Sequence, residues 1–169
     1  MRILVTGGAG FIGSNIVDKL VQKGHSMIVV DNLCKGKRDA INKNNIFYEM
    51  DIQDDGLLGV FDKEKPRYVI HQAAQSDVIR AFQEPCLDAA VNILGTINVL
   101  ECCRKTEVKK IIYASSAAIY GNPQYLGIDE AHPIHPISFY GISKYVSEQY
   151  IPVYYQLYGL RYTILRYAN

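Results

Sequence analysis

The chain has 169 residues, of which 49% are hydrophobic and 21% charged, with a formal net charge of +1. This length and composition predict a single globular domain with a substantial core. The charge balance favours neither nucleic acid nor a membrane as a partner, and a chain without a signal-like segment or a membrane-spanning apolar run is expected in the cytoplasm.

Short β-rich runs alternate with longer amphipathic segments along the chain. The expected strands are Arg2–Thr6, Ser26–Val30, Asn45–Met50, Arg67–His71, Lys109–Ala114 and Arg161–Arg166. The expected helices are Phe11–Lys23, Asp54–Lys63, Pro85–Lys105 and Ser138–Tyr158. Pro152 should kink or break the last of these helices. This alternation predicts an α/β fold, a doubly wound parallel sheet in the strand order 3-2-1-4-5-6.

A glycine-rich segment lies where the first strand ends and the first helix begins, and it contains Gly7, Gly10 and Gly13. Glycines permit a tight turn and the close approach of a pyrophosphate, while the helix start offers free N–H groups to the phosphates. The same residues could form only an ordinary turn. The strand–turn–helix context favours dinucleotide binding.

Asp31 follows the second expected strand, eighteen residues after Gly13. A carboxylate in this position can accept hydrogen bonds from an adenosine ribose and would repel a 2′-phosphate. The alternative is that Asp31 only caps a turn with Asn32. In combination with the glycine segment, Asp31 favours NAD over NADP as the cofactor.

Tyr140 and Lys144 are four positions apart, so they share one face of the last expected helix. An ammonium beside a phenol favours the phenolate, so Lys144 is expected to lower the pKa of Tyr140 and make it a base near neutral pH. Ser115 and Ser116 follow the fifth strand at its carboxyl end, where open parallel sheets bind ligands. A serine hydroxyl there could hold a reacting oxygen beside Tyr140, or the serines could simply end the strand.

The four cysteines form no CxxC pair, and no histidine lies at zinc-finger spacing from them. No metal site is therefore expected. Cys102 and Cys103 lie in a helical pattern, where they are expected to be small buried apolar residues.

These motifs, in this order, resemble the extended short-chain dehydrogenase/reductases, and most closely the NAD-dependent epimerase/dehydratase family. The segments 31–34, 71–75 and 165–169 are particularly similar to those of UDP-glucose 4-epimerases. The resemblance covers nearly the whole chain. It implies that residues 1–169 form a Rossmann-type NAD-binding domain without most of the C-terminal lobe that grips the substrate in the family.

The resemblance also implies a role for each matching position. The expected cofactor-binding residues are Gly7, Gly10, Phe11, Ile12, Gly13, Asp31, Asn32, Asp51, Ile52, Ala73, Ala74, Gln75, Asn92, Tyr140, Lys144 and Tyr167. The expected catalytic residues are Ser116, Tyr140 and Lys144. The expected substrate contacts are Ser116, Tyr140 and Asn169.

The implied reaction is epimerisation of a nucleotide sugar, a UDP-sugar such as UDP-glucose, by transient oxidation. Tyr140 would take the proton of a sugar hydroxyl while the hydride passes to NAD, and the hydride would return to the opposite face of the sugar. Dehydratases of the family carry acidic residues just after the serine segment, where this chain has Ala117 and Ala118. Two alternatives remain: a sugar-nucleotide dehydratase or decarboxylase, and a non-catalytic NAD-binding module.

Two further expectations concern assembly and activity. The segments 85–105 and 138–158 are apolar over much of their surface, and relatives in the family pair through the matching helices, which implies a homodimer. By resemblance, the residues that clamp the nucleotide sugar lie mostly beyond Asn169. The chain alone is therefore expected to have little epimerase activity.

Overall fold

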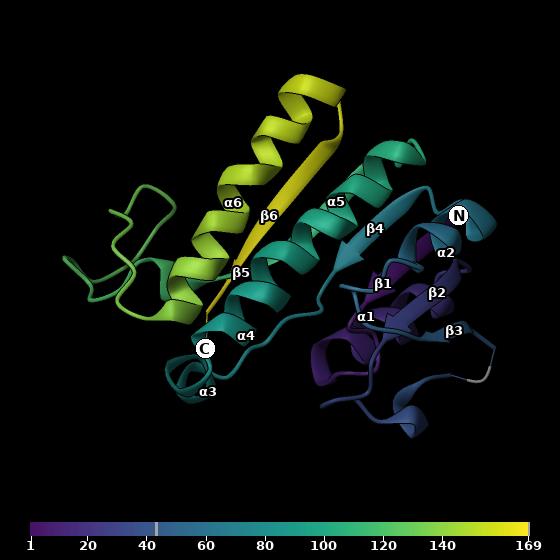
Figure 1. The fold of residues 1–169 in the computed structure, drawn as a ribbon, viewed down its shortest axis with the longest axis horizontal. Coiled ribbons are helices and arrows are strands. Elements are labelled where there is room, and N and C mark those ends of the chain that lie inside the picture. The colour runs from purple at the N-terminus through teal and green to yellow at the C-terminus, as the bar shows by residue number, and fades with distance from the viewer. Residues whose placement is uncertain (43, 169) are drawn as a thin grey trace.

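A computed structural model describes residues 1–42 and 44–168 of the chain. Its core is one sheet of six parallel strands in the order β3-β2-β1-β4-β5-β6, which confirms the predicted fold class and order (Figure 1). The strands are β1 (Arg2–Thr6), β2 (Ser26–Asp31), β3 (Ile46–Glu49), β4 (Tyr68–His71), β5 (Lys110–Ser116) and β6 (Arg161–Tyr167). Three strands extend further at their carboxyl ends than expected, so that β2 ends at Asp31, β5 includes both Ser115 and Ser116, and β6 ends at Tyr167.

The segments between the strands are mostly helical. The helices are α1 (Phe11–Gln22), α2 (Leu57–Glu64), α3 (Val78–Gln83), α4 (Pro85–Ala89), α5 (Gly95–Lys105) and α6 (Phe139–Tyr158). A π-helical turn, η2 (Ala90–Leu94), joins α4 to α5, and 3₁₀ turns form η1 (Arg38–Ala40) and η3 (Ala117–Ile119). The sequence did not predict α3, because six residues are too few to display a helical period.

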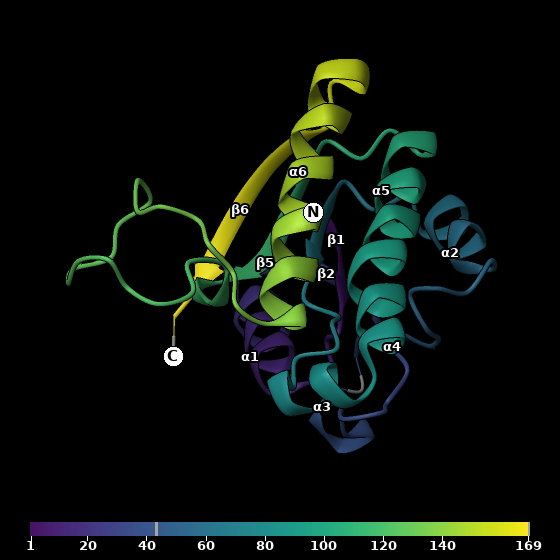
Figure 2. The same ribbon diagram turned by 60° about the vertical axis from the view of Figure 1, so that its left-hand side comes forward.

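The helices cover the two faces of the sheet unequally. On one face, α2, α5 and α6 pack over the larger core, which includes Leu4, Phe61 and Leu100. On the other face, α1 packs through Val17 against a smaller core that includes Val29. Figures 1 and 2 show α5 and α6 running side by side over the sheet, with α1 behind it. Strands buried on both faces explain the nearly continuous apolar runs in the sequence.

The adjacent cysteines of α5 belong to the larger core. Cys102 and Cys103 are 2% and 0% exposed, which confirms their expected role as small apolar residues. Burial raises the pKa of the Cys102 thiol to about 11 and that of Cys103 well above its ordinary value. Both thiols are therefore protonated and unreactive at neutral pH.

Helix α6 continues through Pro152 to Tyr158, so the proline does not break the helix, although a break was one of the two expected outcomes. A proline inside a helix costs about 3 kcal/mol, because it removes one hydrogen bond and crowds the preceding turn. Ile151 and Tyr154, on either side of it, are 0% and 9% exposed. Burial of side chains of this size contributes about 1.5–3 kcal/mol each, which is enough to offset the cost of the proline.

Among the described residues, the helical stretch Pro85–Lys105 is long and apolar enough to cross a membrane, contrary to the sequence-based expectation. Part of its apolar surface lies against the sheet and α6, and it buries the polar side chains of Asp88, Asn92 and Thr96. The core helix of a soluble domain has the same length and composition. The stretch is therefore weak evidence for a membrane span.

The central strand β1 provides a test of the fold, since Leu4 is 0% exposed. Leu4→Ala should lower the free energy of unfolding by about 2–5 kcal/mol, because it leaves a cavity between the sheet and its helices. Denaturant unfolding measures this change. Leu126→Ala, at a side chain that is 94% exposed, is the matched control and should change stability by less than about 0.5 kcal/mol. Equal stability of the Leu4→Ala and Leu126→Ala proteins would contradict the central position of β1.

Candidate functional site

A pocket of about 570 Å³ lies at the carboxyl-terminal edge of the sheet, beside the ends of β1, β2, β3 and β4. The strand order reverses between β1 and β4, and the helices that follow these two strands pack on opposite faces of the sheet. This arrangement opens a crevice at the switch point, the usual ligand site of such sheets. The pocket lining includes these expected cofactor residues: Gly7, Gly10, Phe11, Ile12, Gly13, Asp31, Asn32, Asp51, Ile52, Ala73, Ala74 and Gln75.

The glycine turn lies in contact with the neighbouring strand end. Gly7 has φ +69°, and a Cβ added to it would lie 2.6 Å from the backbone nitrogen of Ala73. A Cβ on Gly13 would lie 2.1 Å from the carbonyl oxygen of Gly7. Helix α1 therefore starts closer to the sheet than a side chain would allow. Its first turn has no side-chain cap at Gly10, so its N–H groups are available to an anion in the pocket.

The carboxylate of Asp31 joins the end of β2 to the glycine turn. Asp31 is 8% exposed and accepts hydrogen bonds from the backbone N–H groups of Ala9 (2.9 Å) and Leu33 (2.8 Å). It therefore caps a turn, as one alternative held, and it also lines the pocket. A carboxylate has about four acceptor positions, so Asp31 can still accept hydrogen bonds from a ligand hydroxyl.

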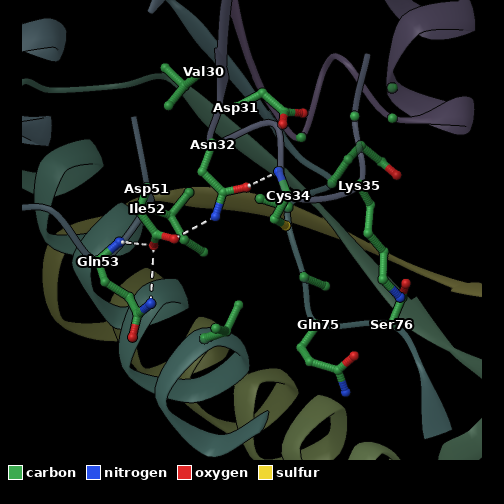
Figure 3. Close-up of a pocket in the computed structure, with 18 of the residues that line it drawn as sticks. Val30, Asp31, Asn32, Cys34, Lys35, Asp51, Ile52, Gln53, Gln75 and Ser76 are labelled. Atoms are coloured by element: carbon green, nitrogen blue, oxygen red, sulfur yellow. Dashed lines mark hydrogen bonds between the residues drawn. The ribbon is translucent and has the colours of Figure 1, made fainter. Parts of the chain in front are cut away.

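A second polar wall follows β2 and β3 (Figure 3). The side-chain nitrogen of Asn32 donates to Asp51 at 2.6 Å, and the backbone N–H of Gln53 donates to the same carboxylate at 2.9 Å. Burial by itself would raise the pKa of Asp51, but the hydrogen bonds from Gln53 and Asn32 outweigh it and lower the pKa. Asp51 is therefore ionised at neutral pH beside the apolar side chain of Ile52.

The loop after β4 is held from behind by Asn92. The Asn92 side chain accepts from the backbone N–H of Gln75 and donates to its carbonyl oxygen, both at 2.9 Å. Asn92 is 1% exposed and belongs to the π-helical turn. It supports the pocket wall but is not part of the lining.

A chain of buried hydrogen bonds passes through His71 at the end of β4. The Ala73 N–H donates to the Thr6 hydroxyl at 3.2 Å, and the Thr6 hydroxyl lies 2.6 Å from Nδ1 of His71. Nε2 of His71 lies 3.0 Å from the Thr96 hydroxyl, which donates its own proton to the Asn92 carbonyl. Nε2 must therefore be the protonated nitrogen of a neutral imidazole, and Nδ1 accepts from Thr6.

The expected catalytic residues lie outside the pocket lining, on β5 and α6. The Lys144 ammonium donates to the Ala114 carbonyl at 3.0 Å and lies 5.9 Å from the centre of the Tyr140 ring. The Ser116 hydroxyl oxygen accepts from the Ala118 N–H at 3.1 Å and caps η3. The structure thus brings Lys144 and Tyr140 together and positions Ser116 at the end of β5.

The expectation that Lys144 lowers the pKa of Tyr140 is wrong for the protein alone. Burial raises the pKa of Tyr140; a hydrogen bond with Ser116 acts in the opposite direction, and the negative charge of Asp88 raises it further. Lys144 is itself buried, and burial lowers its pKa to about 8. Desolvation therefore dominates both groups, an effect that the four-residue spacing in the sequence does not reveal.

The end of β6 reaches the pocket through a hydrogen bond. The side-chain nitrogen of Gln72, which lines the pocket, donates to the Tyr167 hydroxyl at 3.0 Å. Asn169, expected to contact the substrate, lies outside the described residues.

Several lining residues were not expected from the sequence. They lie close in the chain to expected residues. Of these lining residues, only Lys35 and Arg80 have side chains that could have indicated the site from the sequence, because cations bind phosphates. The unexpected lining residues are Val30, Cys34, Lys35, Gly36, Met50, Gln53, Gln72, Ser76, Arg80, Leu87 and Val91.

Comparison with known proteins agrees with this architecture. The model of the NAD dependent epimerase/dehydratase family matches residues 3–169. The chain belongs to this family.

Solved structures and curated proteins that resemble the chain include UDP-glucose 4-epimerases. The crystal structure of this enzyme from Thermotoga maritima with UDP-glucose has a TM-score of 0.98 and 49% identity, and the match covers 100% of this chain and 56% of that chain. The Thermus thermophilus enzyme in complex with NAD has a TM-score of 0.96 and 45% identity, over 99% of this chain and 55% of that chain. The enzyme of Mycolicibacterium smegmatis is 38% identical, over 100% of this chain and 56% of that protein. The chain spans about half the length of the curated relatives it matches.

The buried imidazole of His71 makes stability depend on pH. Burial, with a further contribution from the charge of Lys144, lowers the pKa of His71 to about 3. Between about pH 3 and the unfolded pKa near 6.5, the unfolded chain binds a proton that the folded chain does not, so stability falls as pH falls. From pH 7 to pH 5 this group should lower the free energy of unfolding by about 2 kcal/mol.

Denaturant unfolding of the parent and His71→Gln proteins at both pH values measures this contribution. The variant should lose about 2 kcal/mol less on acidification than the parent. His135→Gln, at an exposed histidine, is the matched control and should behave like the parent. The same loss in the parent and in His71→Gln would contradict a neutral buried imidazole.

Proposed function

We propose that residues 1–169 form the NAD-binding domain of an enzyme that epimerises a nucleotide sugar, with UDP-glucose as the substrate. The observation that carries the proposal is the pocket at the switch point, which combines the glycine turn, Asp31 and the Ala73–Gln75 loop. Family membership supports the reaction class. The similar structures named with NAD and UDP-glucose support the cofactor and the substrate.

The pocket fits the adenosine diphosphate part of NAD. Gly7, Gly10 and Gly13 leave room for a pyrophosphate beside the uncapped start of α1, where Phe11 and Ile12 also line the pocket. Asp31 would accept hydrogen bonds from the ribose hydroxyls, and its charge would repel the additional phosphate of NADP. Asn32, Asp51 and Ile52 would flank the adenine.

The remaining expected cofactor contacts form the nicotinamide side. The nicotinamide ribose and its phosphate would lie beside the loop formed by Ala73, Ala74 and Gln75. Asn92 holds this loop by two hydrogen bonds to Gln75. Lys144 would bind the same ribose, and Tyr167 would lie near the nicotinamide, as its hydrogen bond to Gln72 at the pocket wall suggests.

In the proposed reaction, Tyr140 acts as the base in its phenolate form, which burial disfavours in the protein alone. The phenolate takes the proton of a sugar hydroxyl, which Ser116 holds by a hydrogen bond. When bound, NAD supplies a reversible acceptor for the hydride of the adjoining carbon. After the sugar has turned its opposite face toward the returning hydride, Tyr140 gives the proton back to the sugar oxygen. Ala117 and Ala118 offer no acid for elimination of water, which favours epimerisation over dehydration.

We also propose that the protein is cytoplasmic and has neither nucleic acid nor a membrane as a partner. All four cysteines are free, and Cys34 and Cys86 are exposed. Exposed free thiols suit a reducing compartment.

The first prediction of this proposal is selective binding of NAD. Isothermal calorimetry should show that NAD binds more tightly than NADP. Asp31→Ala should weaken NAD binding by about 1.5–3 kcal/mol, the usual loss for a charge-assisted hydrogen bond. Asp18→Ala, at an exposed acid of α1, is the matched control and should bind like the parent. Equal affinity for the two nucleotides, or no binding of either, would refute the role of Asp31.

The second prediction is a homodimer formed through the outer faces of the long helices. Large apolar side chains are exposed there, including Leu94 at 62%, Val153 at 46% and Leu157 at 66%. Light scattering at micromolar concentration should report a dimer, and Val153→Glu with Leu157→Glu should give a monomer because it buries charge at the interface. A monomeric parent protein would rule the dimer out.

The third prediction concerns catalysis by the chain alone. Precise positioning of a substrate supplies about 7–11 kcal/mol of a barrier, and by resemblance the clamping residues lie mostly beyond Asn169. A coupled assay for conversion of UDP-glucose to UDP-galactose should therefore detect little turnover, and much more in a form extended past Asn169. Robust turnover by the short form would contradict this prediction. If Tyr140→Phe leaves the rate of the extended form unchanged, Tyr140 is not the base.

A further inference from the structure

Asp88 is a buried acid to which the proposed reaction assigns no role. It lies on α4, is 1% exposed, and belongs to no salt bridge among the residues that the structure describes. One of its oxygens accepts hydrogen bonds from the side chains of Gln75 (3.1 Å) and Asn92 (3.0 Å). Both donors are neutral amides, so the negative charge itself is not neutralised by contact. A buried carboxylate without a counter-charge is costly and calls for an explanation.

Lys144, on α6, is a buried cation and the counterpart of the buried anion Asp88. It is 4% exposed, and among the described residues its ammonium donates to one acceptor, the Ala114 carbonyl at 3.0 Å. The same ammonium lies 5.0 Å from the centre of the Tyr113 ring. Within the described part of the chain, no carboxylate reaches ion-pair distance of Lys144 either. The fold therefore buries one anion and one cation that do not touch.

Asn92 links Asp88 to the residue that precedes Lys144. The Asn92 side-chain nitrogen donates to Asp88 and also to the hydroxyl of Ser143 at 3.1 Å. Ser143 is next to Lys144 in α6, and α4 packs directly against α6. Asp88 and Lys144 thus lie on two helices that pack against each other, and Asn92 and Ser143 form a hydrogen-bonded link between these helices.

The other ionisable groups around this site do not supply a counter-charge. His71 is neutral because of its hydrogen bonds and burial, and Tyr113 and Tyr140 have raised pKa values, so both phenols are neutral. Glu148 forms a salt bridge with Arg166 at 2.9 Å. Asp88 is accordingly the one unpaired anion in this part of the described structure.

We propose that Asp88 is a positioning residue whose negative charge keeps the buried Lys144 protonated at neutral pH. Opposite charges attract each other strongly in a poorly solvated interior, and this attraction favours the ammonium form that burial disfavours. The pKa of Lys144, lowered by burial to about 8, is consistent with this, since the charge of Asp88 is the opposing influence. The inference rests on the proposed function only in giving Lys144 a role toward the nicotinamide ribose.

The competing explanation is that Asp88 serves only as a hydrogen-bond acceptor for Gln75 and Asn92. The variant Asp88→Asn distinguishes the two explanations, because an asparagine oxygen can accept the same two hydrogen bonds but carries no charge. If only the hydrogen bonds matter, Lys144 will titrate as in the parent. If the charge matters, the pKa of Lys144 must fall.

The test is a titration of Lys144 by NMR in the full chain without ligand. Its 13Cε resonance, assigned with Lys144→Met, reports the pKa directly. The pKa should lie near 8 in the parent and fall by about one unit or more in Asp88→Asn. Asp18→Asn, which removes the same charge from the exposed surface of α1, is the matched control and should leave the pKa within about 0.3 units.

A Lys144 pKa that is equal in Asp88→Asn and Asp18→Asn would overturn the proposal. If Asp88→Asn is too unstable to titrate, the double variant with Lys144→Met decides. Recovery of folding in the double variant supports the proposal, since the uncompensated ammonium is gone, and equal instability overturns it. Neither measurement uses NAD, so failure here is distinct from a failure of the chain to bind the cofactor.

Discussion

The site depends first on a steric constraint, the absence of side chains where α1 starts against the sheet. A Cβ on Gly13 would collide with the Gly7 carbonyl, and one on Gly7 would collide with the backbone of Ala73. These contacts join the end of β1, the start of α1 and the loop after β4 at one point of the sheet edge. Because the backbone segments approach so closely, the N–H groups of a helix start and the carboxylate of Asp31 line the same pocket.

Buried polar groups then fix the side of the pocket nearest α5 and α6. The hydrogen-bonded chain from Thr6 through His71 and Thr96 to Asn92 connects the central strands to the helices over them. Every member has its partner, so the network can specify one arrangement of the Gln75 loop without the cost of unpaired groups. The same low polarity that strengthens this network explains why Tyr140 and Lys144 have displaced pKa values.

The sequence predicted the features that depend on local pattern. The strand order and the pocket residues of the glycine turn follow from alternation, spacing and chain direction, as does the position of Asp31. Prediction from the sequence was wrong or incomplete where the outcome depends on residues that are far apart in the chain. The proline at position 152 is tolerated because Ile151 and Tyr154 are buried, and the pKa of Tyr140 rises because the fold desolvates it. The π turn that carries Asn92 likewise has no local sequence signature.

The central claim is that the glycine turn, the end of β2 and the loop after β4 form one NAD site. Backbone amide NMR of the labelled chain, recorded as NAD is added, tests it most directly. We predict that the largest shift changes fall on residues 7–13, 31–32 and 73–75, and that α2 and the outer surface of α1 change little. Changes concentrated on another surface, with those three segments unaffected at saturation, would contradict the account.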